Sequence, residues 1–378
     1  MLNTIKLKFI SMANSFKIGT IIGIPIKIHI TFLLVLPFFA IIFAMNPAPY
    51  GFNDVVPASL GYALSFLTTI LLFGCVLLHE LGHSYLAKKY GVKITDITLF
   101  LIGGVSSMEE IPRDPGQEAK MAFAGPLVSF IIGGSLLLLN FAVAGAVSSF
   151  ADSVIFRLVQ MLGSINIVLG MFNLLPAFPM DGGRILRAWF ARKMPYIQAT
   201  HAAAGVGKMF AFLLGMLGLL SNPWNPWLIL IAVFVYMGAS GEDRSTAVTV
   251  TLEKVPVSEV MTKDIVSVEP SLTIDDLTQF MFEKKHMGYP VIEHNTLKGI
   301  ITFTDVRKVM PLDRYSVLVS DVMTKDIVTI PKEATAADAF KLMVSNNIGR
   351  VLVVDENGSV SGILSRTDLM HTMMLLNE

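Results

Sequence analysis

The chain has 378 residues, of which 53% are hydrophobic and only 15% charged, whereas an ordinary soluble domain carries about 25% charged residues. This composition excludes a disordered chain, and the single cysteine excludes a disulfide scaffold. With a net charge of zero the chain is not basic enough for nucleic acid, so a membrane protein is the first expectation.

The charge is divided unevenly along the chain. Residues 1–244 hold 16 Lys and Arg against 11 Asp and Glu, a balance of +5, and residues 245–378 hold 13 against 18, a balance of −5. Every long apolar run lies in the first part. We therefore predict a membrane-embedded domain at 1–244, a linker at 245–254 and a soluble acidic module after it.

Six apolar stretches approach the length of about 20 residues that a membrane-spanning helix needs. They cover residues 28–46, 60–86, 119–142, 154–178, 205–221 and 226–241, of which the last two are short. The loops that contain neither Lys nor Arg are 47–59, 143–153 and 222–225. Since positively charged loops stay in the cytoplasm, we predict a polytopic α-helical membrane protein of about six spans with both termini and the soluble module cytoplasmic.

The second stretch contains the sequence His79-Glu80-Leu81-Gly82-His83. Histidines four residues apart leave the same face of a helix, so His79 and His83 can bind one metal ion. This is the HExxH pattern, in which Zn²⁺ polarises a water molecule and the glutamate, here Glu80, takes its proton. The alternative is a pair of histidines bonded to neighbouring helices, but it leaves three polar groups uncompensated in one turn of a span.

A third metal ligand is expected after the fourth stretch. A catalytic zinc site normally has three protein ligands, and Asp181 is the only acid between Asp152 and Glu242. Pro176 and Pro179 break the helix just before it. Irregular backbone at membrane depth is tolerated only where protein or a water-filled cavity covers it, as in an active site. The alternative for Asp181 is a helix cap at the membrane interface.

The membrane part resembles the site-2 protease family of intramembrane zinc metalloproteases, in its prokaryotic form. Four segments in this order carry the resemblance: His79–His83, Gly103-Gly104-Val105, Ala124-Gly125-Pro126 and Asn173–Gly183. The resemblance implies one zinc ion held by His79, His83 and Asp181, with Glu80 as general base and Asn173 stabilising the oxyanion. One departure is Ser129, where many relatives carry Asn, which puts a polar contact there in doubt.

The segment 94–108 is expected to form a hairpin or an edge strand, because it alternates and is partly β-branched. Such an edge could pair with an unwound substrate, and the resemblance favours this role for Gly103, Gly104 and Val105 over that of a lipid-facing connector. No role is assigned to three further polar residues, which are Cys75, His29 and His201.

The acidic module contains a repeat. Residues 257–266 recur as 319–328, and residues 299–305 recur as 362–368, each copy with an amphipathic helix and an apolar strand between them. Two such copies would pack their sheets together. The repeat resembles a tandem pair of cystathionine-β-synthase-type (CBS) domains, an α/β module predicted at 255–316 and 317–378.

In that family a pair often binds adenine nucleotides, with the strand-end Asp on the ribose and the preceding Thr or Ser near phosphate. The residues that match these positions are Thr302, Asp305, Ser365 and Asp368. The alternative is that both aspartates only cap the helices they precede. CBS pairs commonly pair again, which favours a homodimer.

We therefore interpret the chain as an intramembrane zinc metalloprotease that cleaves transmembrane segments of membrane proteins near the cytoplasmic side, with a CBS pair that regulates it through a nucleotide. One rival interpretation is a CBS-gated cation transporter or channel, because ionisable residues in spans can also line an ion path. Another is an inactive receptor in which zinc is structural, but the intact Glu80 and a set of three ligands argue against it.

Overall fold

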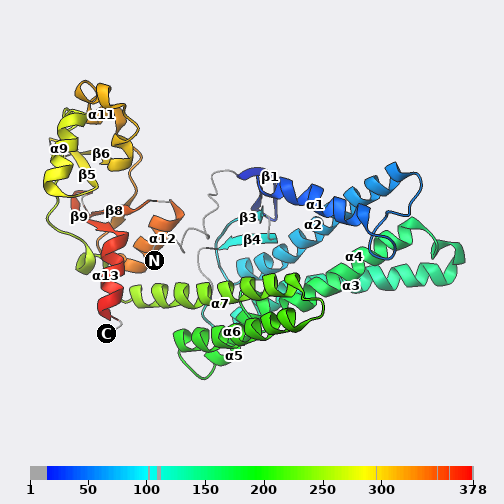
Figure 1. Ribbon diagram of the computed structural model, residues 1–378. Coiled ribbons are helices and arrows are strands. Elements are labelled where there is room, and N and C mark those ends of the chain that lie inside the picture. Colours follow the sequence, from blue (N-terminus) through cyan, green and yellow to red (C-terminus); the bar gives the residue numbers. More distant parts are fainter. Residues whose placement is uncertain are drawn as a thin grey trace. The chain divides into compact units, whose positions relative to one another are not determined.

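The computed structural model describes residues 15–100, 103–108, 112–294, 296–346, 348–356 and 358–376 (Figure 1). The chain divides into two compact units, Met1–Asp243 and Arg244–Glu378. The division falls inside one helix, α7 (Pro226–Leu252). Both chain ends, whose cytoplasmic location was predicted, lie outside the described residues at 1–14 and 377–378.

Helices dominate the first unit. Four are long and apolar enough to cross a membrane: α2 (Ala58–Lys89), α3 (Pro115–Ala146), α4 (Val154–Asn173) and α6 (Tyr196–Leu220). The shorter helices are α1 (Phe32–Met45), α5 (Asp181–Ala191) and a single 3-10 turn, η3 (Ser148–Phe150). The six predicted stretches thus correspond to α1, α2, α3, α4, α6 and the start of α7, which confirms a helical membrane region.

Two helix ends bear on the sequence analysis. Helix α4 ends at Asn173, inside the apolar stretch 154–178, in agreement with the helix break expected at Pro176 and Pro179. Helix α7 runs through most of the segment predicted as a linker and ends at Leu252, which is fully buried in an apolar cluster of the second unit.

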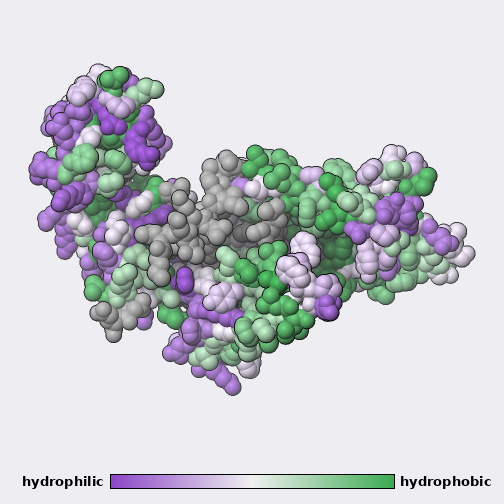
Figure 2. Space-filling view, in the orientation of Figure 1, coloured by the Kyte–Doolittle hydropathy of each residue, from purple (hydrophilic) through white to green (hydrophobic). Residues whose placement is uncertain are grey.

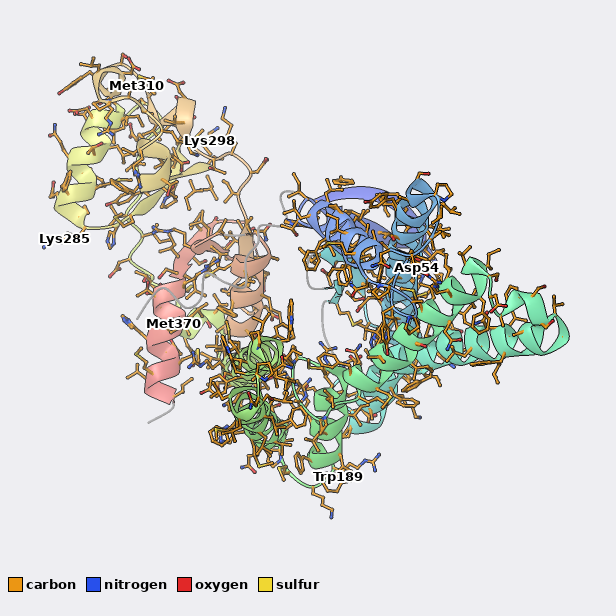
Figure 3. The ribbon with its side chains drawn as sticks, turned by 45° about the vertical axis from the view of Figure 1, so that its right-hand side comes forward. Asp54, Trp189, Lys285, Lys298, Met310 and Met370 are labelled. Carbon is orange, nitrogen blue, oxygen red and sulfur yellow. The ribbon has the colours of Figure 1, made fainter. Side chains whose placement is uncertain are left out.

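The outer surface of the first unit is apolar. Large hydrophobic side chains such as Leu138 and Val168 are 75% and 63% exposed. Figure 2 shows hydrophobic residues over much of this helical unit and mostly hydrophilic residues over the second unit. Trp189 of α5, which is 58% exposed, is a further example (Figure 3). An apolar surface of this extent is typical of a unit that contacts a membrane or another protein, and the long apolar helices favour the membrane.

A four-stranded sheet packs against α2 in the first unit. Its strands are β1 (Ser15–Ile21), β2 (Ile24–His29), β3 (Ile94–Phe100) and β4 (Gly103–Met108), in the order β1-β2-β3-β4. The pairs β1–β2 and β3–β4 are antiparallel, and β2–β3 is parallel. Among the described strands, β4 is therefore an edge strand, as the alternation over 94–108 predicts.

The second unit is the predicted α/β repeat. The first copy contains α8 (Val257–Val260), α9 (Ile274–Lys284), β5 (Gly288–Glu293), β6 (Thr296–Thr302), α10 (Phe303–Val306) and η4 (Pro311–Tyr315). The second contains α11 (Val319–Val322), β7 (Thr329–Pro331), α12 (Ala336–Ser345), β8 (Arg350–Val354), β9 (Val360–Ser365) and α13 (Arg366–Leu376). Strands β5 and β6 pair antiparallel, as do β8 and β9, which confirms the repeat.

The two copies exchange their first segments. Thr262, at the start of the first copy, bridges to Ile363 in the second, and Thr324 of the second copy bridges to Ile300 in the first. The apolar cores follow the same exchange. Val257 packs into the cluster built on α12, β8 and β9, and Val319 packs into the cluster built on α9, β5 and β6. We call these two clusters the second-copy core and the first-copy core.

Candidate metal centre

Three side chains from two helices meet at one point in the first unit. His79 and His83 come from the middle of α2, and Asp181 is the first residue of α5. The two histidine Nε2 atoms are 3.2 Å apart, and Oδ2 of Asp181 lies 3.3 Å from Nε2 of His79 and 3.1 Å from Nε2 of His83. No other group of His, Cys, Asp and Glu in the described residues could hold a metal ion.

These distances fit a zinc ion. Zinc–ligand bonds of 2.0–2.1 Å in tetrahedral geometry put ligand atoms about 3.3 Å apart. Two imidazole nitrogens and a carboxylate oxygen are also a donor set that zinc prefers. Three protein ligands leave the fourth position open, as in catalytic rather than structural zinc sites.

Hydrogen bonds at the far side of each ring orient the histidines. Nδ1 of His83 lies 2.7 Å from the backbone oxygen of Met121. A carbonyl oxygen only accepts, so the proton of His83 is on Nδ1 and Nε2 keeps a free lone pair. Nδ1 of His79 lies 2.9 Å from Oγ of Ser129. The polar contact in doubt at Ser129 is therefore present, and serine supplies it.

Glycines let the backbone approach the site closely. A Cβ atom on Gly125 of α3 would overlap the rings of both His79 and His83. A Cβ on Gly182, which follows Asp181, would overlap the backbone oxygens of Leu174 and Leu175. The Ala-Gly-Pro segment thus brings α3 against α2, and the Asp-Gly-Gly segment brings the start of α5 against the turn at Leu174 and Leu175.

Glu80 lies beside the two histidines and faces the sheet. Its Oε2 accepts a hydrogen bond of 3.2 Å from the Ser106 hydroxyl of β4. Gly104 of the same strand packs on its side chain. Gly103 has a positive φ of 127°, a conformation that glycine adopts readily. The side chain of Val105 lies outside the described part of the chain.

The remaining polar residues of the sequence analysis lie in other settings. Asn173, at the end of α4, donates from Nδ2 to the backbone oxygen of Leu169 at 3.0 Å. His29 is buried beside Thr31, and His201 is exposed next to Asp243. Cys75 is buried and free, one turn before His79. The structure does not place Asn173, His29, His201 or Cys75 in the metal cluster.

A buried ion cluster, which the sequence did not indicate, is built on α5, the helix that begins with Asp181. Arg187 of α5 is 1% exposed and binds Glu118 of α3 at 2.6 Å and Glu242 of α7 at 2.7 Å. Its guanidinium also stacks over the rings of Phe178 and Tyr196, at 5.1 and 4.9 Å. The cluster ties α5, which begins with Asp181, to three neighbouring helices.

The residues predicted to contact nucleotide form two matching sets in the second unit. In the first copy the Thr302 hydroxyl donates to Oδ2 of Asp305 at 2.6 Å, and in the second copy the Ser365 hydroxyl donates to Oδ2 of Asp368 at 2.7 Å. The backbone N–H of each hydroxyl residue donates to the same oxygen. Both aspartates therefore cap helices, which is the alternative role considered above.

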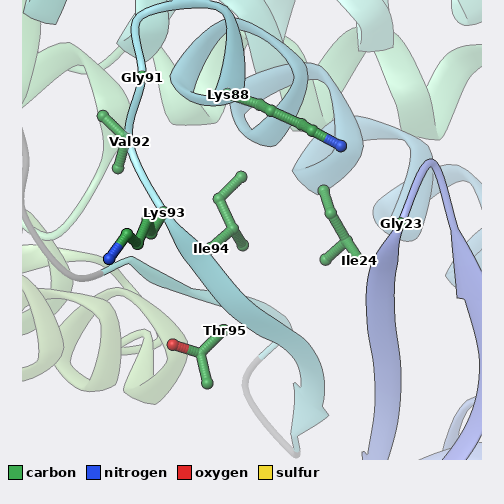
Figure 4. Close-up of a pocket in the computed structure, with 8 residues that line it drawn as sticks. All are labelled: Gly23, Ile24, Lys88, Gly91, Val92, Lys93, Ile94 and Thr95. Atoms are coloured by element: carbon green, nitrogen blue, oxygen red, sulfur yellow. The ribbon is translucent and has the colours of Figure 1, made fainter.

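A separate pocket lies where β2, α2 and β3 meet (Figure 4). Lys88 reaches over it and donates from Nζ to the backbone oxygen of Ile22 at 2.9 Å, and Lys93 stands at its other side. None of its eight lining residues belongs to the metal cluster.

Comparisons with known proteins agree with this geometry. The profile of peptidase family M50 matches residues 67–153 and 140–214, and the CBS domain profile matches residues 257–312 and 319–375. A zinc metalloprotease of Methanocaldococcus jannaschii is 40% identical over 97% of this chain and 98% of its own length. The chain belongs to the site-2 proteases of peptidase family M50.

Two other matches cover one unit each. The solved structure of a site-2 protease from Methanocaldococcus jannaschii has 45% identity and a TM-score of 0.43, over 61% of this chain and 95% of that one. An inosine-5'-monophosphate dehydrogenase of the same organism is 32% identical over 30% of this chain and 22% of its own length. The relative that is 40% identical over 97% of the chain and the two family profiles show a membrane-embedded zinc metalloprotease that carries a tandem CBS module, so the transporter interpretation is set aside.

Proposed function

We propose that this site-2 protease cleaves transmembrane segments of other membrane proteins at the His79–His83–Asp181 site. The observation that carries the proposal is the meeting of these three ligand atoms inside a helical unit whose outer surface is apolar. A zinc ion bound there would act as a Lewis acid on the scissile carbonyl and on the attacking water.

The chain's own groups divide the remaining chemistry. Glu80 is next to His79 and takes the proton of the attacking water as general base. It then delivers a proton to the leaving amine. Asn173 donates one Nδ2 hydrogen to the backbone oxygen of Leu169. The second Nδ2 hydrogen can donate to the developing oxyanion.

The substrate is held as an extended strand. A peptide in a helix keeps its carbonyls in internal hydrogen bonds, so it must unwind before hydrolysis. The edge strand β4 offers unpaired backbone groups for strand addition, with Gly103, Gly104 and Val105 at its start. Since Glu80 packs on Gly104, a substrate strand paired with β4 passes directly beside the base.

The depth of the site favours cleavage near the cytoplasmic side. His79 lies nine residues before Lys88 on α2, or about 13 Å along the helix axis. The positively charged end of α2 is the cytoplasmic end by the charge rule. The six-span topology and the cytoplasmic CBS module follow from the same rule.

The decisive experiment compares purified wild type with Glu80→Gln and Asp181→Ala on a panel of tagged single-span substrates. Glu80→Gln is expected to abolish cleavage and keep one zinc per chain, because the ligands are intact. Asp181→Ala is expected to lose both cleavage and zinc. Metal content is measured by mass spectrometry and cleavage by gel shift.

Two results would contradict the proposal. Cleavage by Glu80→Gln would show that Glu80 is not the general base. Full zinc content in Asp181→Ala would show that Asp181 is not the third zinc ligand. If the wild type binds zinc but cleaves no substrate of the panel, the result would support an inactive receptor instead.

We also infer that the CBS module binds an adenine nucleotide, preferentially at the second copy. In the first copy Lys308 occupies Oδ1 of Asp305 at 2.8 Å, whereas Oδ1 of Asp368 accepts no hydrogen bond from any described residue. Arg350 of β8 is close enough to Asp368 to interact with it electrostatically. Asp368 can therefore still accept ribose hydroxyls, with Arg350 nearby for phosphate.

Calorimetric titration of the full-length protein with AMP and ATP tests this assignment. We expect Asp368→Asn to weaken binding more than Asp305→Asn does. Equal effects of the two variants, or no binding by the wild type, would contradict it.

A further inference from the structure

The inner face of the edge strand β4 lies against the catalytic helix α2. Side chains two residues apart on a strand share a face, so Gly104 and Ser106 point the same way and Ser107 points the other way. Gly104 and Ser106 both contact Glu80, whereas the Ser107 hydroxyl lies 3.5 Å from Asp96 of β3. One strand therefore carries two neighbouring serines in different settings.

A chain of hydroxyl groups ends on the carboxylate of Glu80. Ser106 donates to Oε2 of Glu80 at 3.2 Å, and Oγ of Ser84 lies 3.0 Å from Oγ of Ser106. A serine hydroxyl has one hydrogen, which Ser106 gives to Glu80, so Ser84 must donate to Ser106. Ser84 is fully buried one turn after Glu80 on α2. The direction of both hydrogen bonds is thereby fixed toward the base.

Gly104 of the same strand also limits the position of the Glu80 side chain. A Cβ atom at this position would lie 2.5 Å from Cγ and 3.2 Å from Cδ of Glu80. The side chain of Glu80 thus rests on the backbone of β4 while Ser106 holds its oxygen. Neither Ser84 nor Ser106 belongs to the HExxH pattern or to the metal ligands.

We propose that Ser106, supported by Ser84, is a positioning residue for the general base Glu80. The inference rests on the proposed function, since it assigns a role within that reaction. Because β4 is also the strand proposed to hold the substrate, the base and the scissile peptide are positioned against one element. Misplacement of a catalytic group by about 1 Å can lower a rate a hundredfold, so a single hydrogen bond to the base has a measurable effect.

The test uses the full-length protein and a single-span substrate that the wild type cleaves. Ser106→Ala is expected to lower kcat about tenfold with KM and zinc content unchanged, since the hydrogen bond acts on the base and not on binding. Ser106→Thr keeps a hydroxyl and suits a strand, so it should restore most of kcat. Ser107→Ala is the matched control on the opposite face and should keep wild-type kcat.

Ser84→Ala provides a second variant that leaves the strand intact. It is expected to lower kcat by a smaller factor, about two- to threefold, because Ser106 is still present but less fixed. Equal kcat in Ser106→Ala and Ser107→Ala would overturn the proposal, as would a rise in KM alone or a loss of zinc. If Glu80→Gln is inactive while Ser106→Ala keeps full kcat, only this inference fails, and if Glu80→Gln is active the proposed function fails with it.

Discussion

The two units of this site-2 protease differ in where their polar side chains lie. Among the described residues, most of the buried polar side chains belong to the first unit, and only Thr246 and Asp305 belong to the second. The second unit has two apolar cores, built around side chains such as Leu277 and Val353. In lipid the apolar surface can face outward, so the interior is left for the groups that perform chemistry.

The comparison also shows what keeps each interior stable. In the first unit the polar groups of the candidate site are held by further polar groups, as Ser129 holds His79 and Ser106 holds Glu80. In the second unit Thr302 and Asp305 form a capping box at the start of α10. Loss of one polar partner should therefore cost much more in the first unit than in the second.

The largest effect is expected from the buried ion cluster. Arg187→Ala leaves Glu118 buried and unpaired and should destabilise the first unit by about 3–5 kcal/mol. The measurement is the thermal unfolding midpoint of the detergent-solubilised protein. Arg192→Ala, at the exposed end of the same helix, is the control and should change little. Equal midpoints for the two variants would show that Arg187 is not needed for stability.

A smaller effect is expected from the hydrogen bond between Ser129 and His79. Ser129→Ala removes the hydrogen bond that orients His79 and should weaken zinc binding about 10- to 100-fold. Competition with a chelator of known affinity measures this change. Ser135→Ala, exposed on the same helix and bonded to its own backbone, is the control. An unchanged zinc affinity would show that packing alone orients the ring.

The smallest effect is expected in the second unit. Burial alone would raise the pKa of Asp305, but the Lys308 ammonium and the Thr302 hydroxyl outweigh it and hold the pKa below its usual value. The ionised cap therefore stabilises the fold above the unfolded-state pKa of about 3.9, and this contribution is lost as the pH falls through the lowered folded-state value. Asp305→Asn should cost about 1 kcal/mol at pH 7.

The pH dependence distinguishes this cap from a general loss of structure. The difference in unfolding midpoint between wild type and Asp305→Asn should narrow at a pH below the folded-state pKa, where the wild-type carboxylate is protonated as well. Asp264→Asn, at an exposed position, is the control and should match wild type throughout. A difference that stays constant with pH would rule out the charge as the cause.

The sequence predicted those parts of the site that depend on local spacing. His79 and His83 share a helix face by their separation alone, and Asp181 was the only acid in its part of the chain. The long apolar stretches predicted the helical membrane region, and the recurring segments predicted the α/β repeat. The structure and the comparisons confirm both.

Ser106 and Ser84 could not be recognised in the same way, because their roles depend on contacts between a strand and a helix. The Arg187 cluster likewise joins side chains that are distant in the sequence, since Glu118 and Glu242 are 69 and 55 residues away from Arg187. At Ser129 the departure from the family pattern was visible, but only the structure shows that serine reaches His79. Local patterns therefore predict the metal ligands better than the groups that orient them.

The exchange of segments between the CBS copies has a consequence for any attempt to divide the module. A cut after residue 316 removes Val319 from the first-copy core and leaves Val257 without the second-copy core on which it packs. Each half would then expose apolar surface that the intact protein covers. The two copies should therefore unfold as one cooperative unit. Ligand binding at either proposed nucleotide position would then change the stability of both copies.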